Sequence, residues 1–137
     1  MVLFNNSLIR LDYNPATDIM EVEYPDLHDY LLPEIKRSVD ILLDTVKNYD
    51  VKRLLLDSTR TIISVGDVES REIATYLAAG LARTRVQKVA RVQSPSATVE
   101  NTAQQNIRHI SQVQALPFKL ENFSSKALAL EWLGGKA

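Results

Sequence analysis

Two early segments of the chain alternate apolar and polar residues, the pattern of strands with one buried face. One runs from Leu8 to Tyr13, and the other, from Ile19 to Tyr24, alternates Met20 and Val22 with two glutamates. The stretch NPATD between them contains the Asn, Pro and Asp that are typical of a tight turn. We predict an antiparallel hairpin, because so short a connection cannot join parallel strands.

The rest of the chain alternates helical stretches with short apolar runs. An apolar stripe at helical spacing predicts a helix that begins near Leu31 or Leu32, where Pro33 fits the first turn. Three more helices are expected over 67–84, from SPSAT at 94–98 onward, and over KALALEWL, capped by Ser124 or Ser125. The short apolar runs predict strands at 52–57, 86–92 and 118–123.

This order, β-β-α-β-α-β-α-β-α, predicts a single α/β domain over residues 1–137. Strands that alternate with helices pair in parallel, so the expected sheet is mixed and five-stranded, with four helices. The apolar start MVLF has no partner in this arrangement, and we expect it to cover an opening in the core or to form an interface. The second helix is expected to turn its apolar stripe inward: Ile73, Tyr76, Leu77, Gly80 and Leu81.

Composition narrows the functional classes. The chain has 137 residues, 45% of them apolar, with no cysteine, two histidines and a net charge of −1. These values argue against disulfides, a metal site, a bound cofactor and nucleic-acid binding. The sequence has neither a long apolar stretch nor a signal-peptide pattern at its start, so we expect a cytoplasmic protein without a membrane span.

The element order, the strand KRLLLD and the ending FKLENFSSKALALEWL together resemble the anti-sigma factor antagonist-like (STAS-like) family. The ending is most similar to the bacterial branch of that family, whose last helix finishes in Ala-Leu-x-Trp-Leu, here Ala129 to Leu133. The resemblance implies a STAS-like fold and a non-catalytic regulatory role in binding other proteins.

Well-known members of that family are phosphorylated on a serine that follows the third strand, in the motif Asp-Ser-Ser-Gly. This chain departs from that motif, because DSTR at 57–60 places Arg60 where glycine is expected. It thus resembles members without a clear phospho-switch motif. Ser58 and Ser64 are the positions at which such a switch would remain possible.

The stretch from Leu54 to Ser70, LLLDSTRTIISVGDVES, is the candidate site. An apolar run stops at Asp57, and about ten residues pass before helical periodicity resumes, which is longer than the usual connection in such units. Ligands in open α/β sheets bind beyond the carboxyl ends of the strands, where we expect the loops 25–30, 57–66 and 94–98 to gather. The candidate ligand- or partner-binding residues are Asp57, Ser58, Thr59, Arg60, Ile63, Ser64 and His28.

Other interpretations of these residues stay open. The hydroxyls of the loop suit turn and cap chemistry, and Asp57 could cap a helix or pair with Arg60. A hydrolase triad of Asp57, His28 and Ser58 is disfavoured, because the chain has no G-x-S-x-G elbow. We expect no catalytic residues and no enzyme.

The leading hypothesis is therefore a regulatory, protein-binding module of STAS-like type that binds a partner protein or a second copy of itself. The alternative is a domain that binds a small anionic or lipid-like ligand in the cleft at the strand ends. A deep apolar pocket would favour the ligand, and a flat surface with an exposed serine would favour the partner.

Overall fold

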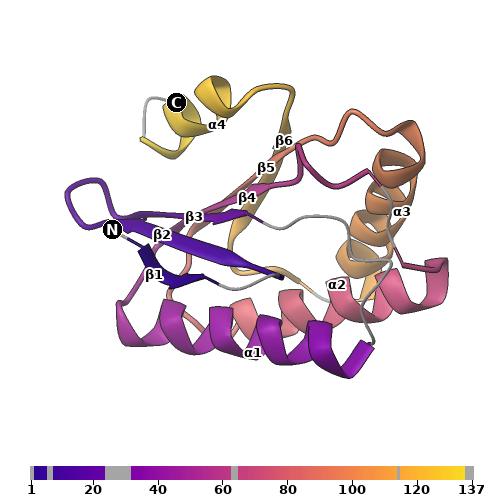
Figure 1. The fold of residues 1–137 in the computed structure, drawn as a ribbon, viewed down its shortest axis with the longest axis horizontal. Helices are drawn as coiled ribbons and strands as arrows, with labels where there is room; N and C mark the ends of the chain where they lie inside the picture. Colours follow the sequence, from indigo (N-terminus) through magenta and orange to yellow (C-terminus); the bar gives the residue numbers. More distant parts are fainter. Residues whose placement is uncertain (1, 6–7, 24–31, 63–64, 114, 135–137) are drawn as a thin grey trace.

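The computed structural model describes residues 2–5, 8–23, 32–62, 65–113 and 115–134 (Figure 1). Its strands and helices, in chain order, are β1 (Val2–Asn5), β2 (Arg10–Asn14), β3 (Ile19–Glu23), α1 (Leu32–Asn48), β4 (Arg53–Asp57), α2 (Asp67–Leu81), β5 (Lys88–Val92), α3 (Ala97–Val113), β6 (Lys119–Phe123) and α4 (Lys126–Leu133).

The strands form one mixed sheet whose spatial order is the chain order, β1-β2-β3-β4-β5-β6. β1, β2 and β3 pair antiparallel, and β3 to β6 pair in parallel. The α/β class, the mixed sheet and the four helices are confirmed, but the prediction of five strands is wrong. The missing strand is β1, formed by the apolar start of the chain, which pairs with β2 and sends Leu3 and Phe4 toward the main core.

The helices cover the two faces of the sheet unequally. Because each crossover advances by one strand in the same direction, right-handed connections place α1, α2 and α3 on one face. Figure 1 shows these three helices on one side of the sheet and α4 alone on the other. Strand order therefore never reverses, and the sheet has no topological switch point of the kind that forms an edge crevice for ligands.

Strand β4 is covered on both faces, as its apolar run predicted. Leu54 and Leu56 face the three-helix layer, whereas Leu55, fully buried, packs beneath α4 with Ala129 and Leu133. The N-cap of α4 is Ser125, whose hydroxyl accepts a hydrogen bond from the Leu128 amide at 3.3 Å. The ring of Trp132 lies 5.5 Å from that of Phe123, so it anchors this helix to β6.

Helix α2 packs closely on α1 as well as over the sheet. A Cβ on Gly80 would lie 2.3 Å from Cδ1 of Leu43 in α1, so this glycine permits the close helix–helix approach. The expected inward position of Tyr76 is wrong, because its side chain is exposed and its hydroxyl donates to Asp40 of α1. Ala78 is buried on this helix instead.

Candidate functional site

A cavity of about 230 Å³ lies between the sheet and the three-helix layer. Its floor is made by apolar residues of the strands, including Val22, Leu56 and Val89. Its walls come from α1, α2 and α3, and Phe118 closes one side just before β6. An engineered cavity of about 150 Å³ with similar lining binds benzene, so this space is large enough for a small organic molecule.

The space exists because small side chains occupy core-facing positions of two helices. In α2 the wall residues recur at helical spacing and include Ser70, Ala74 and Ala78. In α3 the corresponding small residue is Ala103, with Ile107 one turn further on. These short side chains do not reach the sheet, which leaves a void that most protein interiors do not tolerate.

Two of the three predicted loops meet at one end of this cavity. The Ser58 amide donates to the carbonyl of Val92 at 3.2 Å, and the Ser94 hydroxyl donates to the carbonyl of Thr61. Ser58, Thr61 and Ser94 are all buried, and the first two line the cavity. The predicted gathering of loops 57–66 and 94–98 is confirmed, whereas loop 25–30 lies outside the described residues.

Arg91 brings a buried charge to the same end of the cavity. Its guanidinium donates to both carboxylate oxygens of Glu100 at 2.7 and 2.8 Å, and the Ser94 amide donates to Glu100 at 2.7 Å. Burial opposes ionisation of Glu100, but these hydrogen bonds outweigh it and hold its pKa below the ordinary value. The cavity-lining cation is thus neutralised by a bidentate ion pair.

The N-termini of the neighbouring helices are supplied with their own carboxylates. α2 carries Asp67 and Glu69 in its first turn, and α3 carries Glu100. These groups already occupy the positive end of each helix dipole. The arrangement is therefore poorly suited to an anion, one of the two ligand types, anionic and lipid-like, that the sequence left open for this region.

Asn106 is the most distinctive polar group of the lining. It is 5% exposed, lies on α3, and its side-chain amide nitrogen donates to the hydroxyl oxygen of Ser70 at 3.0 Å. Its amide oxygen has no hydrogen-bond partner among the described residues. Ser38, 7% exposed on α1, likewise lines the cavity, and its hydroxyl pairs with nothing in the described part of the chain.

The predicted site residues separate into different environments. Asp57 accepts hydrogen bonds from the amide and hydroxyl of Thr59 at 3.0 and 2.6 Å, which is turn chemistry, and Arg60 pairs with Glu23 at 2.9 Å rather than with Asp57. Ser58 is fully buried and faces the cavity. His28, Ile63 and Ser64 lie outside the described residues. The possible phosphorylation site at Ser64 is therefore outside them too.

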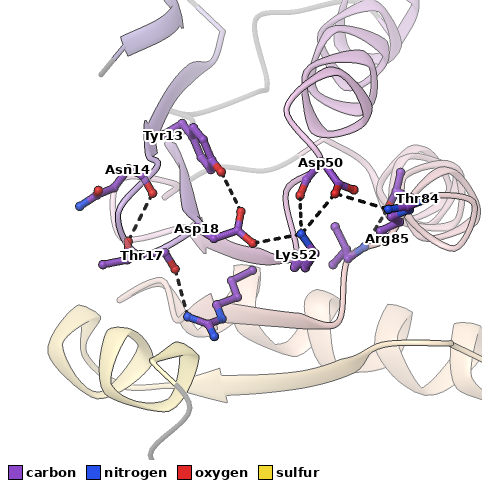
Figure 2. Close-up of polar contacts among 10 residues, drawn as sticks. Tyr13, Asn14, Thr17, Asp18, Asp50, Lys52, Thr84 and Arg85 are labelled. Carbon is purple, nitrogen blue, oxygen red and sulfur yellow. Dashed lines mark hydrogen bonds and ion pairs between the residues drawn. The ribbon is translucent and has the colours of Figure 1, made fainter.

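A second polar cluster lies at the opposite, amino end of the parallel strands (Figure 2). The Tyr13 hydroxyl donates to Asp18 at 2.8 Å, and the Lys52 ammonium lies 3.8 Å from Asp18 and 3.3 Å from Asp50, which also faces Arg85 at 3.6 Å. Burial of Tyr13, with its hydrogen bond to Asp18, raises its pKa to about 12. This cluster ties together the turns before β3, β4 and β5, a structural task.

Two polar residues of the cavity lining were not predicted, although the sequence carries a signal for each. Arg91 lies on the same side of β5 as the buried Val89, and Asn106 follows Ala103 by three residues on the apolar stripe of α3. A polar residue in a buried stripe costs free energy unless something pairs with it, so each position indicated an interior polar contact.

No protein-family model, curated protein or solved structure gives a significant match to this chain. The described residues contain no cluster of three acidic or histidine side chains that could hold a metal ion. None of the helices in the described ranges is long and apolar enough to cross a membrane.

Proposed function

We propose that this protein binds a small, largely apolar molecule in the cavity between its sheet and its three-helix layer. The observation that carries the proposal is the cavity itself, about 230 Å³ in volume and lined mainly by aliphatic side chains. Ligand sites of this kind are concave, apolar and largely preformed, with a few polar groups that orient the ligand.

The free-energy cost of an empty cavity favours the presence of a bound ligand. Unfilled core volume costs about 24 cal/mol per Å³, so an empty cavity of this size would cost on the order of 5 kcal/mol. That is a large part of the 5–15 kcal/mol by which ordinary domains are stable. A ligand that fills the space recovers the lost contacts, and natural selection for binding explains why small residues such as Ala78 and Ala103 stand where larger ones would pack better.

The sequence left two ligand classes open, anionic and lipid-like, in a cleft at the strand ends, and we propose the lipid-like class in a different place. Its site lies under the helices, with only its polar end at the carboxyl edge of the sheet. The carboxylates on α2 and α3 and the neutralised Arg91 argue for an uncharged, lipid-like molecule over an anionic one.

Capture of the tagged protein from its own cells, followed by extraction and mass spectrometry of bound small molecules, tests this proposal. Ala78→Leu should fill part of the cavity and lose the captured molecule, whereas Ala79→Leu, on the exposed side of the same helix, should retain it. Recovery of the same molecules with both variants would contradict binding in this cavity.

The STAS-like interpretation remains a second candidate, in which the β4–α2 connection binds a partner protein. Exposed residues favour it: Ile62 and Val68 are 58% and 78% exposed, near the exposed Arg60. Replacing Arg60 by Ala together with Ile62 by Ser should then abolish capture of a protein without lowering the melting temperature. The matched control changes Arg83 to Ala and Leu128 to Ser, two exposed positions elsewhere.

The other partner that we propose is a second copy of this chain. β1 is an edge strand, and Val2 on it is 49% exposed, so its outer backbone groups offer a place for a second copy to pair. Sedimentation that shows a dimer in the native chain and a monomer after Val2→Lys would support this, and a native monomer at every practical concentration would remove it.

A further inference from the structure

The cavity lining contains buried polar groups whose hydrogen-bonding capacity is not fully satisfied within the described part of the chain. Asn106 is only 5% exposed, yet among the described residues only one end of its side-chain amide has a partner, the hydroxyl of Ser70. Exchanging the amide oxygen and nitrogen would change which end is paired but would still leave one end without a partner in the described part of the chain. Such a group ordinarily costs about 1–3 kcal/mol, so a protein retains it when something else satisfies it.

A second group of the same kind comes from another helix. The hydroxyl of Ser38, on α1, lines the cavity at 7% exposure and has no partner among the described residues. Because α1 and α3 lie on either side of α2, these two polar groups reach the cavity from the two outer helices of the layer. Apart from Ser70, which pairs with Asn106, the described α2 residues of the wall between them are apolar, including Ile73 and Leu77.

We infer that the ligand is an uncharged amphipathic molecule with an apolar body and a hydroxyl-type group that hydrogen-bonds to Asn106. This inference rests on the proposed function and names the ligand class that the cavity takes. A hydroxyl both donates and accepts, so it suits either end of the Asn106 amide. By proportion with benzene in a cavity of about 150 Å³, the space holds about ten non-hydrogen atoms.

A charged head group is disfavoured by the same surroundings. Among the described residues of the lining the one charged side chain is Arg91, which already makes two hydrogen bonds to Glu100 and lies 3.4 Å from the amide oxygen of Asn122. A carboxylate in the cavity would compete with Glu100 for that guanidinium and would lose its own hydration. An ammonium group would meet the same guanidinium as a like charge.

Two probes of equal size, butylbenzene and 4-propylphenol, test the inference by isothermal titration calorimetry with the full chain. The measured quantity is the ratio of their Kd values in the native protein and in Asn106→Leu, which keeps the branched shape and the number of non-hydrogen atoms of the side chain. The hydrogen bond should make the native ratio favour the phenol about tenfold more than the variant ratio does. Gln105→Leu, at an exposed position of the same helix, should leave the native ratio unchanged.

The outcomes separate the two proposals. If both probes bind and Asn106→Leu leaves their Kd ratio unchanged, Asn106 does not recognise the ligand, and the inference fails while cavity binding stands. If neither probe binds the native protein, the proposed function itself fails. Tighter binding of 4-ethylbenzoate than of 4-propylphenol would overturn the uncharged class, and Asn106→Ala provides the same comparison should the Leu variant not fold.

Discussion

The guanidinium of Arg91 in β5 and the carboxylate of Glu100 in α3 form two hydrogen bonds of 2.7 and 2.8 Å across the polar end of the cavity. The pair fixes the first turn of α3 to strand β5 of the sheet. The amide of Ser94, in the intervening loop, donates to the same carboxylate at 2.7 Å. One carboxylate thus holds the strand, the loop and the helix that shape this end of the site.

Glu100→Gln should lower the free energy of unfolding at pH 7 by about 1–3 kcal/mol, because it removes the charge that balances a buried guanidinium. The pKa of Glu100 in the folded protein lies below the ordinary value of 4.5. Its stabilisation is therefore present above about pH 4.5 and is lost as the pH falls through the folded pKa. Urea unfolding from pH 7 to pH 3 should show the native advantage over Glu100→Gln shrinking below pH 4.5. Glu131→Gln, at an exposed site on α4, serves as the control, and a difference that stays constant to pH 3 would contradict the assignment.

The raised pKa of Tyr13 predicts that the free energy of unfolding falls as the pH rises into the alkaline range. Its pKa rises from 10 in the unfolded chain to about 12 in the folded protein, so the folded state prefers the protonated phenol. The corresponding stability is complete below pH 10 and declines as the pH rises toward 12. Denaturation at pH 9 and at pH 11.5 should show the native chain losing stability relative to Tyr13→Phe. Equal losses of stability in the native chain and in Tyr13→Phe would count against burial of the Tyr13 hydroxyl beside Asp18.

Filling the cavity should stabilise the protein when no ligand is present. Ala78→Leu adds three carbon atoms next to the empty volume, and each methylene newly buried contributes about 0.8 kcal/mol. We expect a gain of about 1–2 kcal/mol after some strain, measured by chemical denaturation. Ala79→Leu, one residue along and exposed, should change stability by less than about 0.5 kcal/mol. A loss of stability in Ala78→Leu would mean that the void is not adjacent to this side chain.

Substitution of Leu55 tests whether β4 is covered by helices on both faces of the sheet. It is fully buried beneath α4, so Leu55→Ala should lower the free energy of unfolding by about 2–5 kcal/mol. Leu128→Ala, on the half-exposed side of α4, should cost less than about 1 kcal/mol. A loss of under about 1 kcal/mol for Leu55→Ala would show that α4 does not cover the strand.

Local sequence patterns were sufficient for most of the fold. Alternating residues identified β2 and β3, and apolar runs identified β4, β5 and β6, because these strands bury side chains in ways that appear in sequence order. β1 was not predicted because Val2 to Asn5 is short and does not alternate apolar with polar residues. It becomes a strand only by pairing with the edge of β2. Tyr76 was misplaced because its spacing fits the stripe of α2, although its hydroxyl is satisfied by Asp40 at the surface.

The site was harder to predict, for a reason that lies in three dimensions. The loop hydroxyls drew attention to Ser58 and its neighbours, and the structure does bring Ser58 and Thr61 to one end of a cavity. The cavity itself depends on the combined volumes of side chains from α1, α2, α3 and the sheet, which no local pattern records. A role for Asn106 in binding can be inferred only once the residues on the other side of the cavity are known.

Binding in the cavity is tested most directly by titrating the protein, labelled with ¹³C at its methyl groups, with butylbenzene and following the methyl resonances by NMR. We expect saturable shifts of the Ile73 and Ile107 methyls, which line the cavity, with no change for Leu55 and Leu133 on the α4 side of the sheet. Shifts confined to exposed methyls such as those of Val68 and Leu128, or no saturable shift at all, would contradict it.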